Sequence, residues 1–124
     1  MEKEKKAYTD LDVWKEARVF ANEVYNATKL FPKEEMFGLI SQMRRCAVSI
    51  ASNIAEGCGR NHSKDSIQFF FVSRGSLYEL ETQIYIPSDQ NYINETLGKA
   101  LLSKVEITRK LLSGFIKYYQ NLAK

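Results

Sequence analysis

The chain contains few of the residues that force turns or form cross-links. Its 124 residues include two prolines, two cysteines, one histidine and one tryptophan. So few prolines leave long helices uninterrupted. A chain of this length suits one hydrophobic core, so we assign residues 1–124 to a single domain. Residues 1–9 are rich in alternating glutamate and lysine, and we predict that they form a flexible lead-in.

The two cysteines, Cys46 and Cys58, do not suit a disulfide. They lie about three helical turns apart if the residues between them form one helix. Reduced thiols are typical of cytoplasmic proteins. The sequence has no apolar run close to the roughly 20 residues of a membrane span, and none follows the charged start. We therefore expect a cytoplasmic protein without a membrane-embedded segment.

No set of residues has the spacing of a catalytic or metal site. Cys58 and His62 are four residues apart, but a zinc site takes four ligands and the sequence offers no second such pair. A cluster of Glu56, Glu79 and Glu81 would lack the Glu-x-x-His elements of di-iron bundles. The sequence has neither a nucleophile elbow nor a glycine-rich phosphate loop. We predict that the protein is not an enzyme and uses no metal or cofactor.

A long helical pattern between Met36 and Arg60 is the most informative part of the sequence. Apolar and small residues recur on one face at alternating spacings of four and three: Met36, Ile40, Met43, Ala47, Ile50, Ile54 and Gly57. The opposite face is polar and holds Gln42, Arg45, Ser49, Ser52, Asn53, Glu56 and Arg60. We interpret the apolar face as a core seam. We interpret Ser49, Asn53 and Glu56 as part of a polar stripe that serves assembly or binding.

Three other segments show the same amphipathic pattern. They cover about residues 14–28, 64–86 and 97–122. Short connections at 31–33, 59–62 and 87–91 separate the four helices, and we expect Pro87 to end the third helix and Asn94 to cap the fourth. Four such helices without a strand pattern predict an all-α fold, an antiparallel up-down-up-down four-helix bundle.

The third helix has apolar residues around much of its circumference. One strip consists of Ile67, Phe71, Tyr78 and Tyr85, and the other consists of Phe69, Leu77, Leu80 and Ile84. A lone bundle covers only one side of a helix, so one strip should face a second copy, and we assign that contact to the second strip. Arg74 and Glu81 lie between the strips, and we expect them to pair if buried, with Glu56 as a candidate third member. The alternative is an exposed pair beside a broad core strip.

Basic residues are unevenly distributed, although the net charge is only +3. Residues 76–90 include acids but no base, whereas bases dominate from residue 91 onward. The candidate contacts with nucleic acid are Arg44, Arg45, Arg60, His62, Lys64, Lys104 and Lys110. One copy would bind weakly, and an oligomer that repeats the patch would bind more tightly. The alternatives are a solvated helix face and, for Arg45, Glu56 and Arg60, salt bridges within or between subunits.

Two segments, SIASNIAEG at 49–57 and GSLYELETQ at 75–83, resemble a known family. It is the four-helix bundle family encoded in intervening sequences of bacterial large-subunit ribosomal RNA genes, whose members are often labelled ribosomal proteins. The residues Phe31-Pro32, Phe37-Gly38-Leu39 and Arg44-Arg45 agree as well, so the resemblance covers nearly the whole chain. The chain departs from the family pattern at Ala51, where members usually carry proline.

The resemblance implies an assembly and a class of partner. Accessory proteins of diversity-generating retroelements are similar in fold, form pentameric rings with basic surfaces, and associate with a reverse transcriptase and nucleic acid. By this resemblance we expect a homo-oligomer, a ring of five copies, with RNA or DNA and a reverse transcriptase-like protein as candidate partners. We predict a non-enzymatic oligomer that presents a basic surface to nucleic acid as an accessory to a nucleic-acid enzyme. The alternative is a protein-interaction scaffold without nucleic-acid contact.

Overall fold

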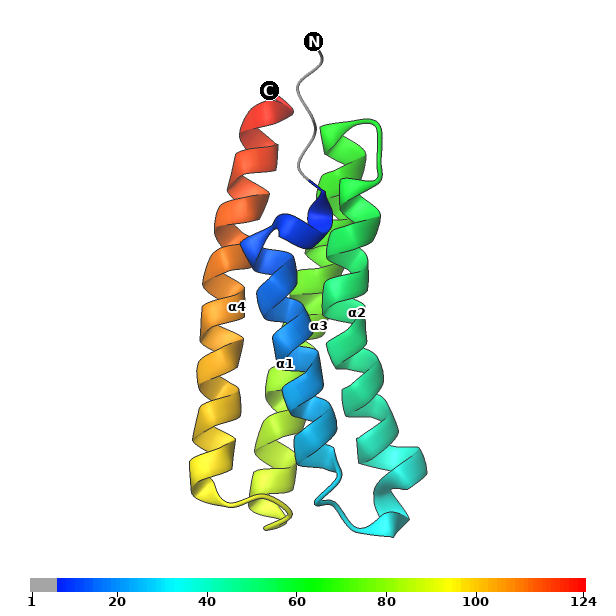
Figure 1. The fold of residues 1–124 in the computed structure, drawn as a ribbon, viewed down its shortest axis with the longest axis vertical. Helices are drawn as coiled ribbons and strands as arrows, with labels where there is room; N and C mark the ends of the chain where they lie inside the picture. Colours follow the sequence, from blue (N-terminus) through cyan, green and yellow to red (C-terminus); the bar gives the residue numbers. More distant parts are fainter. Residues whose placement is uncertain (1–6) are drawn as a thin grey trace.

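The computed structural model describes residues 7–124, and helices account for nearly all of them (Figure 1). A 3-10 turn, η1 (Tyr8–Asp10), precedes α1 (Asp12–Thr28). A second short turn, η2 (Lys33–Glu35), and a π-helical turn, η3 (Met36–Ile40), lead into α2 (Ser41–Cys58). The last two helices are α3 (Ser63–Asp89) and α4 (Glu95–Leu122). Residues 7–124 contain no strand, which confirms the predicted all-α class.

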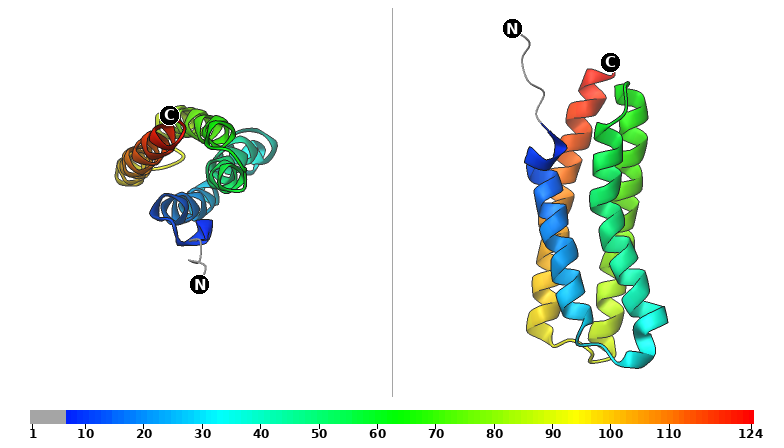
Figure 2. Two further views of the ribbon diagram at one scale, coloured as in Figure 1. Left: turned by 90° about the horizontal axis from the view of Figure 1, so that it is seen from above. Right: turned by 45° about the vertical axis from the view of Figure 1, so that its right-hand side comes forward.

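The four long helices form an antiparallel up-down-up-down bundle, as their periodicity predicts. In Figure 1, α1 runs away from the end that holds the C terminus, α2 returns to it, α3 runs away again and α4 returns. Consecutive helices pack side by side, and α4 also packs against α1 (Figure 2). The α1–α2 end of the bundle contains η2 and η3, and the α2–α3 end contains the turn at 59–62. A helix long and apolar enough to span a bilayer is absent from residues 7–124.

The hydrophobic core is built from the repeating apolar face of each helix. Its largest fully buried side chains are Phe20, Phe70, Met43, Ile50, Ile54, Leu77, Leu80, Ile84, Leu101, Leu112, Val24 and Val105. Helices α2 and α3 approach each other most closely. At Gly57 a Cβ atom would overlap the Phe70 ring and lie 2.9 Å from the Ser66 carbonyl oxygen. Ser73 donates to the Ile50 carbonyl across the same contact at 2.8 Å, so small residues allow this close packing.

Two helix boundaries differ from prediction. The helix predicted from Met36 onward is interrupted, because the backbone leaves helical geometry at Gly38 (φ −111°, ψ −112°). Helix α3 continues through Pro87 to Asp89, although proline has no N–H to donate to the carbonyl four residues earlier. The predicted cap of α4 is confirmed: the Asn94 side chain accepts a hydrogen bond from the Leu97 N–H at 2.8 Å.

The lead-in predicted over residues 1–9 lies outside the described residues up to Lys6. Beyond it, Tyr8 belongs to η1, and its ring meets the ring of Trp14 edge-on with centroids 5.4 Å apart. This contact places η1 over the start of α1.

Candidate nucleic-acid interface

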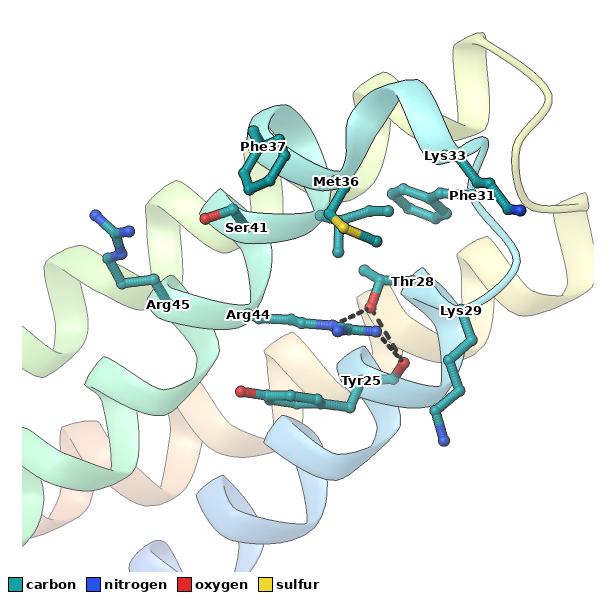
Figure 3. A pocket seen from close by; sticks show the side chains of 11 residues that line it. Tyr25, Thr28, Lys29, Phe31, Lys33, Met36, Phe37, Ser41, Arg44 and Arg45 are labelled. Carbon is teal, nitrogen blue, oxygen red and sulfur yellow. Dashed lines mark hydrogen bonds between the residues drawn. The ribbon is translucent and has the colours of Figure 1, made fainter.

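A groove of about 630 Å³ opens at the α1–α2 end (Figure 3). The lining residues are Tyr25, Thr28, Lys29, Phe31, Lys33, Met36, Phe37, Ile40, Ser41, Arg44 and Arg45. They include four cations and no carboxylate. A groove with aromatic walls and a cationic rim favours an anionic ligand that also carries an apolar body.

Arg44 lies across this groove in a fixed orientation (Figure 3). Its guanidinium is 4.7 Å from the centroid of the Tyr25 ring. The Nε atom donates to the Thr28 hydroxyl at 2.8 Å, and Nη2 donates to the Tyr25 carbonyl at 3.4 Å. These contacts join the start of α2 to the end of α1, and the planar guanidinium is thereby pre-organised.

The turn η3 exposes two apolar side chains at the edge of the groove. Phe37 is 94% exposed and Met36 is 54% exposed. The prediction that Met36 belongs to the core seam is therefore wrong, and sequence reasoning gave Phe37 no separate role. The sequence feature that could have predicted this exposure is Gly38, because a glycine directly after Phe37 weakens the helix there. With the helix broken there, residues 36 and 37 no longer follow the register of α2.

The predicted nucleic-acid contacts do not form one patch. Arg44 and Arg45 line the groove at the α1–α2 end, whereas Arg60, His62 and Lys64 lie beyond the other end of α2, about 20 Å away along the helix. Sequence reasoning missed Lys29 and Lys33, which join Arg44 and Arg45 at the groove. The signal for them was the pair of lysines flanking Phe31-Pro32.

Several of the other predicted cations already have partners within the subunit. Arg60 pairs with Glu56 at 3.0 Å and lies over the Phe69 ring at 4.3 Å. Lys104 pairs with Glu16 at 3.0 Å and with Glu23 at 3.7 Å. The hydrogen bond to Glu16 is the main reason why the pKa of Lys104 is raised. Lys104 therefore joins α4 to α1, and the prediction that it contacts phosphate is not supported.

Lys110, His62 and Lys64 remain exposed on the surface. Lys110 lies on α4, whereas His62 and Lys64 flank the start of α3. They do not line the groove at the α1–α2 end. Any phosphate contact by these residues would belong to a separate surface.

Only part of the predicted polar stripe lies at the contact between α2 and α3: Ser49 meets Ser76 of α3 there, whereas Glu56 is exposed. The hydroxyls of Ser49 and Ser76 are 3.0 Å apart, and the Asn53 amide donates to the Ser49 carbonyl at 2.9 Å. The bond between Ser49 and Ser76 satisfies polar groups at the close contact between the helices, whereas the Asn53 bond lies within α2. Among residues 7–124, Glu56 pairs only with Arg60, so its predicted role beside Arg74 is wrong within the subunit.

The predicted pair of Arg74 and Glu81 is absent among the ion pairs of residues 7–124. The Arg74 guanidinium instead lies 4.9 Å from the centroid of the Phe71 ring. The two charged residues are about two helical turns apart on α3, a separation of about 10 Å along the axis. This distance explains why they do not meet.

The strip of α3 assigned to a second copy faces the interior instead. Leu77 is 1% exposed, and Leu80 and Ile84 are 0% exposed, while Phe69 is partly covered by Arg60. The assignment of Leu77, Leu80 and Ile84 to an intersubunit contact is therefore wrong. The large apolar side chains of α3 that face outward are Val72, Tyr78, Tyr85 and Ile86, which are 46–53% exposed. Periodicity identified two strips but not which one the bundle covers.

The two cysteines are free thiols held in the neutral form. Burial raises the pKa of Cys46 to about 12, and the negative charge of Glu79 adds to the effect. Burial also raises the pKa of Cys58. A neutral thiol is a poor nucleophile and metal ligand. Within residues 7–124 no three histidine, cysteine or acidic side chains form a group that could hold a metal ion.

Comparisons with known proteins agree with this fold. Residues 9–114 match the family described as 23S rRNA-intervening sequence protein. The chain is also similar to a solved structure from Bacteroides thetaiotaomicron, a protein of unknown function from the S23 ribosomal protein family. The two chains are 23% identical, the match covers 85% of this chain and 98% of the other, and the TM-score is 0.78. None of the curated proteins matches this chain.

Proposed function

Because the chain belongs to the family of 23S rRNA-intervening sequence proteins, we propose that it is a non-enzymatic, homo-oligomeric protein that binds RNA or DNA through a basic surface. The observation that carries this proposal is the charge of the groove at the α1–α2 end. Lys29, Lys33, Arg44 and Arg45 line it without a carboxylate. Lysine and arginine side chains that neutralise phosphates release the counterions condensed on a nucleic acid, which favours binding of a polyanion at low salt.

The groove of one subunit offers few phosphate contacts. Four cations give modest affinity at physiological salt, because each phosphate contact is weakened as salt rises. Several copies on one nucleic acid raise the affinity because the later contacts become intramolecular. A ring of five copies is the form expected from the family resemblance.

Helix α3 supplies the surface that supports assembly. Its outward residues Val72, Tyr78, Tyr85 and Ile86 are each about half exposed, and exposed apolar side chains along one helix mark a protein contact. Arg74 stacked on Phe71 adds a cation at the edge of this face. A second candidate function rests on the same residues: a scaffold that docks another protein, such as a reverse transcriptase-like enzyme, and makes no nucleic-acid contact.

A titration of labelled single-stranded RNA across salt concentrations tests nucleic-acid binding. We expect the logarithm of the affinity to fall linearly with the logarithm of salt. Replacing Lys29, Lys33 and Arg45 by glutamine should reduce the salt slope by about 2, because each phosphate contact on a single strand contributes about 0.7. The matched control replaces three exposed lysines outside the groove, Lys15, Lys99 and Lys117, and should leave the slope nearly unchanged.

If binding is absent or independent of salt, the proposal of nucleic-acid binding is wrong, and the protein-interaction scaffold remains as the proposed function. Equal losses in the two triple variants would show that the groove is not the binding site.

Light scattering at micromolar concentration tests assembly. We expect an oligomer, and we expect Tyr78→Glu combined with Tyr85→Glu to dissociate it, because two charges would enter an apolar contact. The control is Val19→Glu on α1, where the native side chain is similarly exposed at 45%. A wild-type monomer would contradict assembly.

A further inference from the structure

The exposed ring of Phe37 makes no evident contribution to folding. At 94% exposure it leaves nearly all of its surface in water, whereas a phenylalanine in a protein core buries a large apolar area. The turn that carries it is nevertheless well fixed. The Glu35 carboxylate accepts from the Leu39 N–H at 3.4 Å and from the Tyr92 hydroxyl at 3.1 Å. The backbone that carries the exposed ring is therefore fixed by hydrogen bonds.

A second flat surface lies in the same groove. The Arg44 guanidinium is stacked on Tyr25 and held by two hydrogen bonds to the end of α1. Phe37 and Arg44 both line the groove, and Figure 3 shows Met36 directed toward the Arg44 guanidinium and Phe37 on the outer side of η3. Aromatic rings and guanidinium planes are the surfaces on which unpaired nucleic-acid bases stack.

The charge of the rim complements a sugar-phosphate backbone. Lys29, Lys33 and Arg45 are exposed beside the groove. The neighbouring acids are Glu34 and Glu35 of η2, of which Glu35 is engaged by Leu39 and Tyr92 and neither lines the groove. An occupant must therefore combine a flat apolar group with negative charge. A duplex hides its base faces in the helical stack, but a single strand presents them.

We propose that the groove at the α1–α2 end binds an unpaired base against Phe37 and the adjacent phosphates on Lys33 and Arg45, so that the protein prefers single strands to duplexes. This inference rests on the proposed function and specifies the form of nucleic acid. It gives Phe37 the role of a stacking platform and gives Lys33 and Arg45 the role of phosphate contacts.

Three probes of equal length separate base contacts from phosphate contacts: a single strand of about 12 nucleotides, the same backbone without bases, and a duplex. The wild-type protein should bind the single strand more tightly than the abasic strand. Phe37→Ala should weaken binding of the single strand about 5-fold to 100-fold and leave the abasic strand and the salt slope unchanged. Phe37→Trp should retain the preference. The control variant is Leu30→Ala, which removes an apolar side chain that is 64% exposed outside this groove.

The outcomes separate this inference from the function on which it rests. Salt-dependent binding with the same ratio of single-strand to abasic affinity in the wild type and in Phe37→Ala would overturn the inference and leave nucleic-acid binding in place. No binding of any probe by the wild type would remove both. If Phe37→Ala lowers the oligomeric state in light scattering while affinity per subunit is unchanged, the groove is a contact between copies, and the inference is wrong.

Discussion

The two ends of the bundle use similar side chains in opposite ways. At the α2–α3 end, Phe70 is 0% exposed and lies 4.8 Å from the ring centroids of both Phe115 and Tyr119. At the α1–α2 end, Phe37 is 94% exposed. The arginines at the two ends differ in their ionic partners. Arg60 is paired with Glu56, whereas no carboxylate lines the groove around Arg44.

This difference separates residues that maintain the fold from residues that are available to a ligand. Aromatic contacts at the α2–α3 end add to the burial of apolar surface and so stabilise the bundle. An exposed ring surrounded by cations contributes little to folding stability. We expect it to contribute to ligand binding instead. Mutations at the two ends should therefore affect different measurements.

The largest expected difference is between two phenylalanine truncations. Phe70→Ala should lower the free energy of unfolding by about 3–5 kcal/mol, because it removes a buried ring and leaves a cavity. Phe37→Ala should change it by less than about 0.5 kcal/mol, because the ring is already in water. Urea unfolding followed by circular dichroism measures both values.

The comparison requires that the free energy of unfolding fall with urea concentration at the same slope in both variants and the wild type. The urea midpoint then reports stability. If Phe37→Ala destabilises the protein as much as Phe70→Ala does, the ring at the α1–α2 end has a structural partner and the division between the ends is wrong.

The second prediction concerns glycines in α2 and α3. Gly57→Ala should destabilise the protein by about 1–3 kcal/mol, because the new Cβ would overlap Phe70 and approach the Ser66 carbonyl. Gly75 on α3 has no atom within 4 Å of its Cβ position. Gly75→Ala should therefore stabilise the helix by about 0.5–1 kcal/mol. Thermal unfolding of both variants checks the signs, and a neutral Gly57→Ala would show that α2 can move away from α3 freely.

The fold could be predicted from the sequence because each helix carries its own amphipathic pattern. The seam at Met43, Ile50 and Ile54 is buried as expected, and four such segments with short connections admit few other arrangements. The pattern fails where local backbone changes intervene. At the interruption around Gly38, the Glu35 side chain accepts hydrogen bonds from Leu39 and from Tyr92, a residue far away in the sequence, and helical periodicity does not report such contacts.

The candidate site was harder to predict for a related reason. Periodicity showed that α3 is apolar on two strips, but the choice between them depends on which strip α2 and α4 cover. Leu80 and Ile84 are covered completely, and Tyr78 and Tyr85 remain half exposed. The tyrosines carry hydroxyls that favour contact with water, and this chemical difference was the available signal. The sequence identified the basic residues but not their ionic partners. For Lys104 these partners are Glu16 and Glu23, which lie on another helix.

A smaller difference is expected between the two arginines. Arg44→Gln should cost about 1.5 kcal/mol, because it removes charged hydrogen bonds that join α2 to α1. Arg60→Gln should cost about 0.5 kcal/mol, because its pair with Glu56 is exposed and lies within one helix. Urea unfolding at low and high salt measures both changes. Equal costs for the two variants would contradict a linking role for Arg44.

The two thiols should respond differently to alkaline solution. The pKa of Cys46 is raised from 9.0 to about 12 by burial, so the unfolded chain loses this proton at a lower pH than the folded chain. Between these two values the unfolded state binds fewer protons, and the free energy of unfolding must fall as pH rises. Cys46→Ser does not titrate there and retains a donor for the Ser76 carbonyl, which Cys46 contacts at 2.9 Å.

The measurement is the loss of unfolding free energy between about pH 7 and about pH 10 in the wild type, Cys46→Ser and Cys58→Ser. The wild type should lose more than Cys46→Ser, whereas Cys58→Ser should resemble the wild type more closely. The reason is that Cys46 is buried in the contact between α2 and α3, and Cys58 at the α2–α3 end is partly exposed. All other ionisable groups are common to the three proteins, so only the differences among the proteins report on the thiols. If the wild type and Cys46→Ser lose the same unfolding free energy, water reaches the Cys46 thiol. The contact between α2 and α3 would then be hydrated at Cys46, as the groove around Phe37 is.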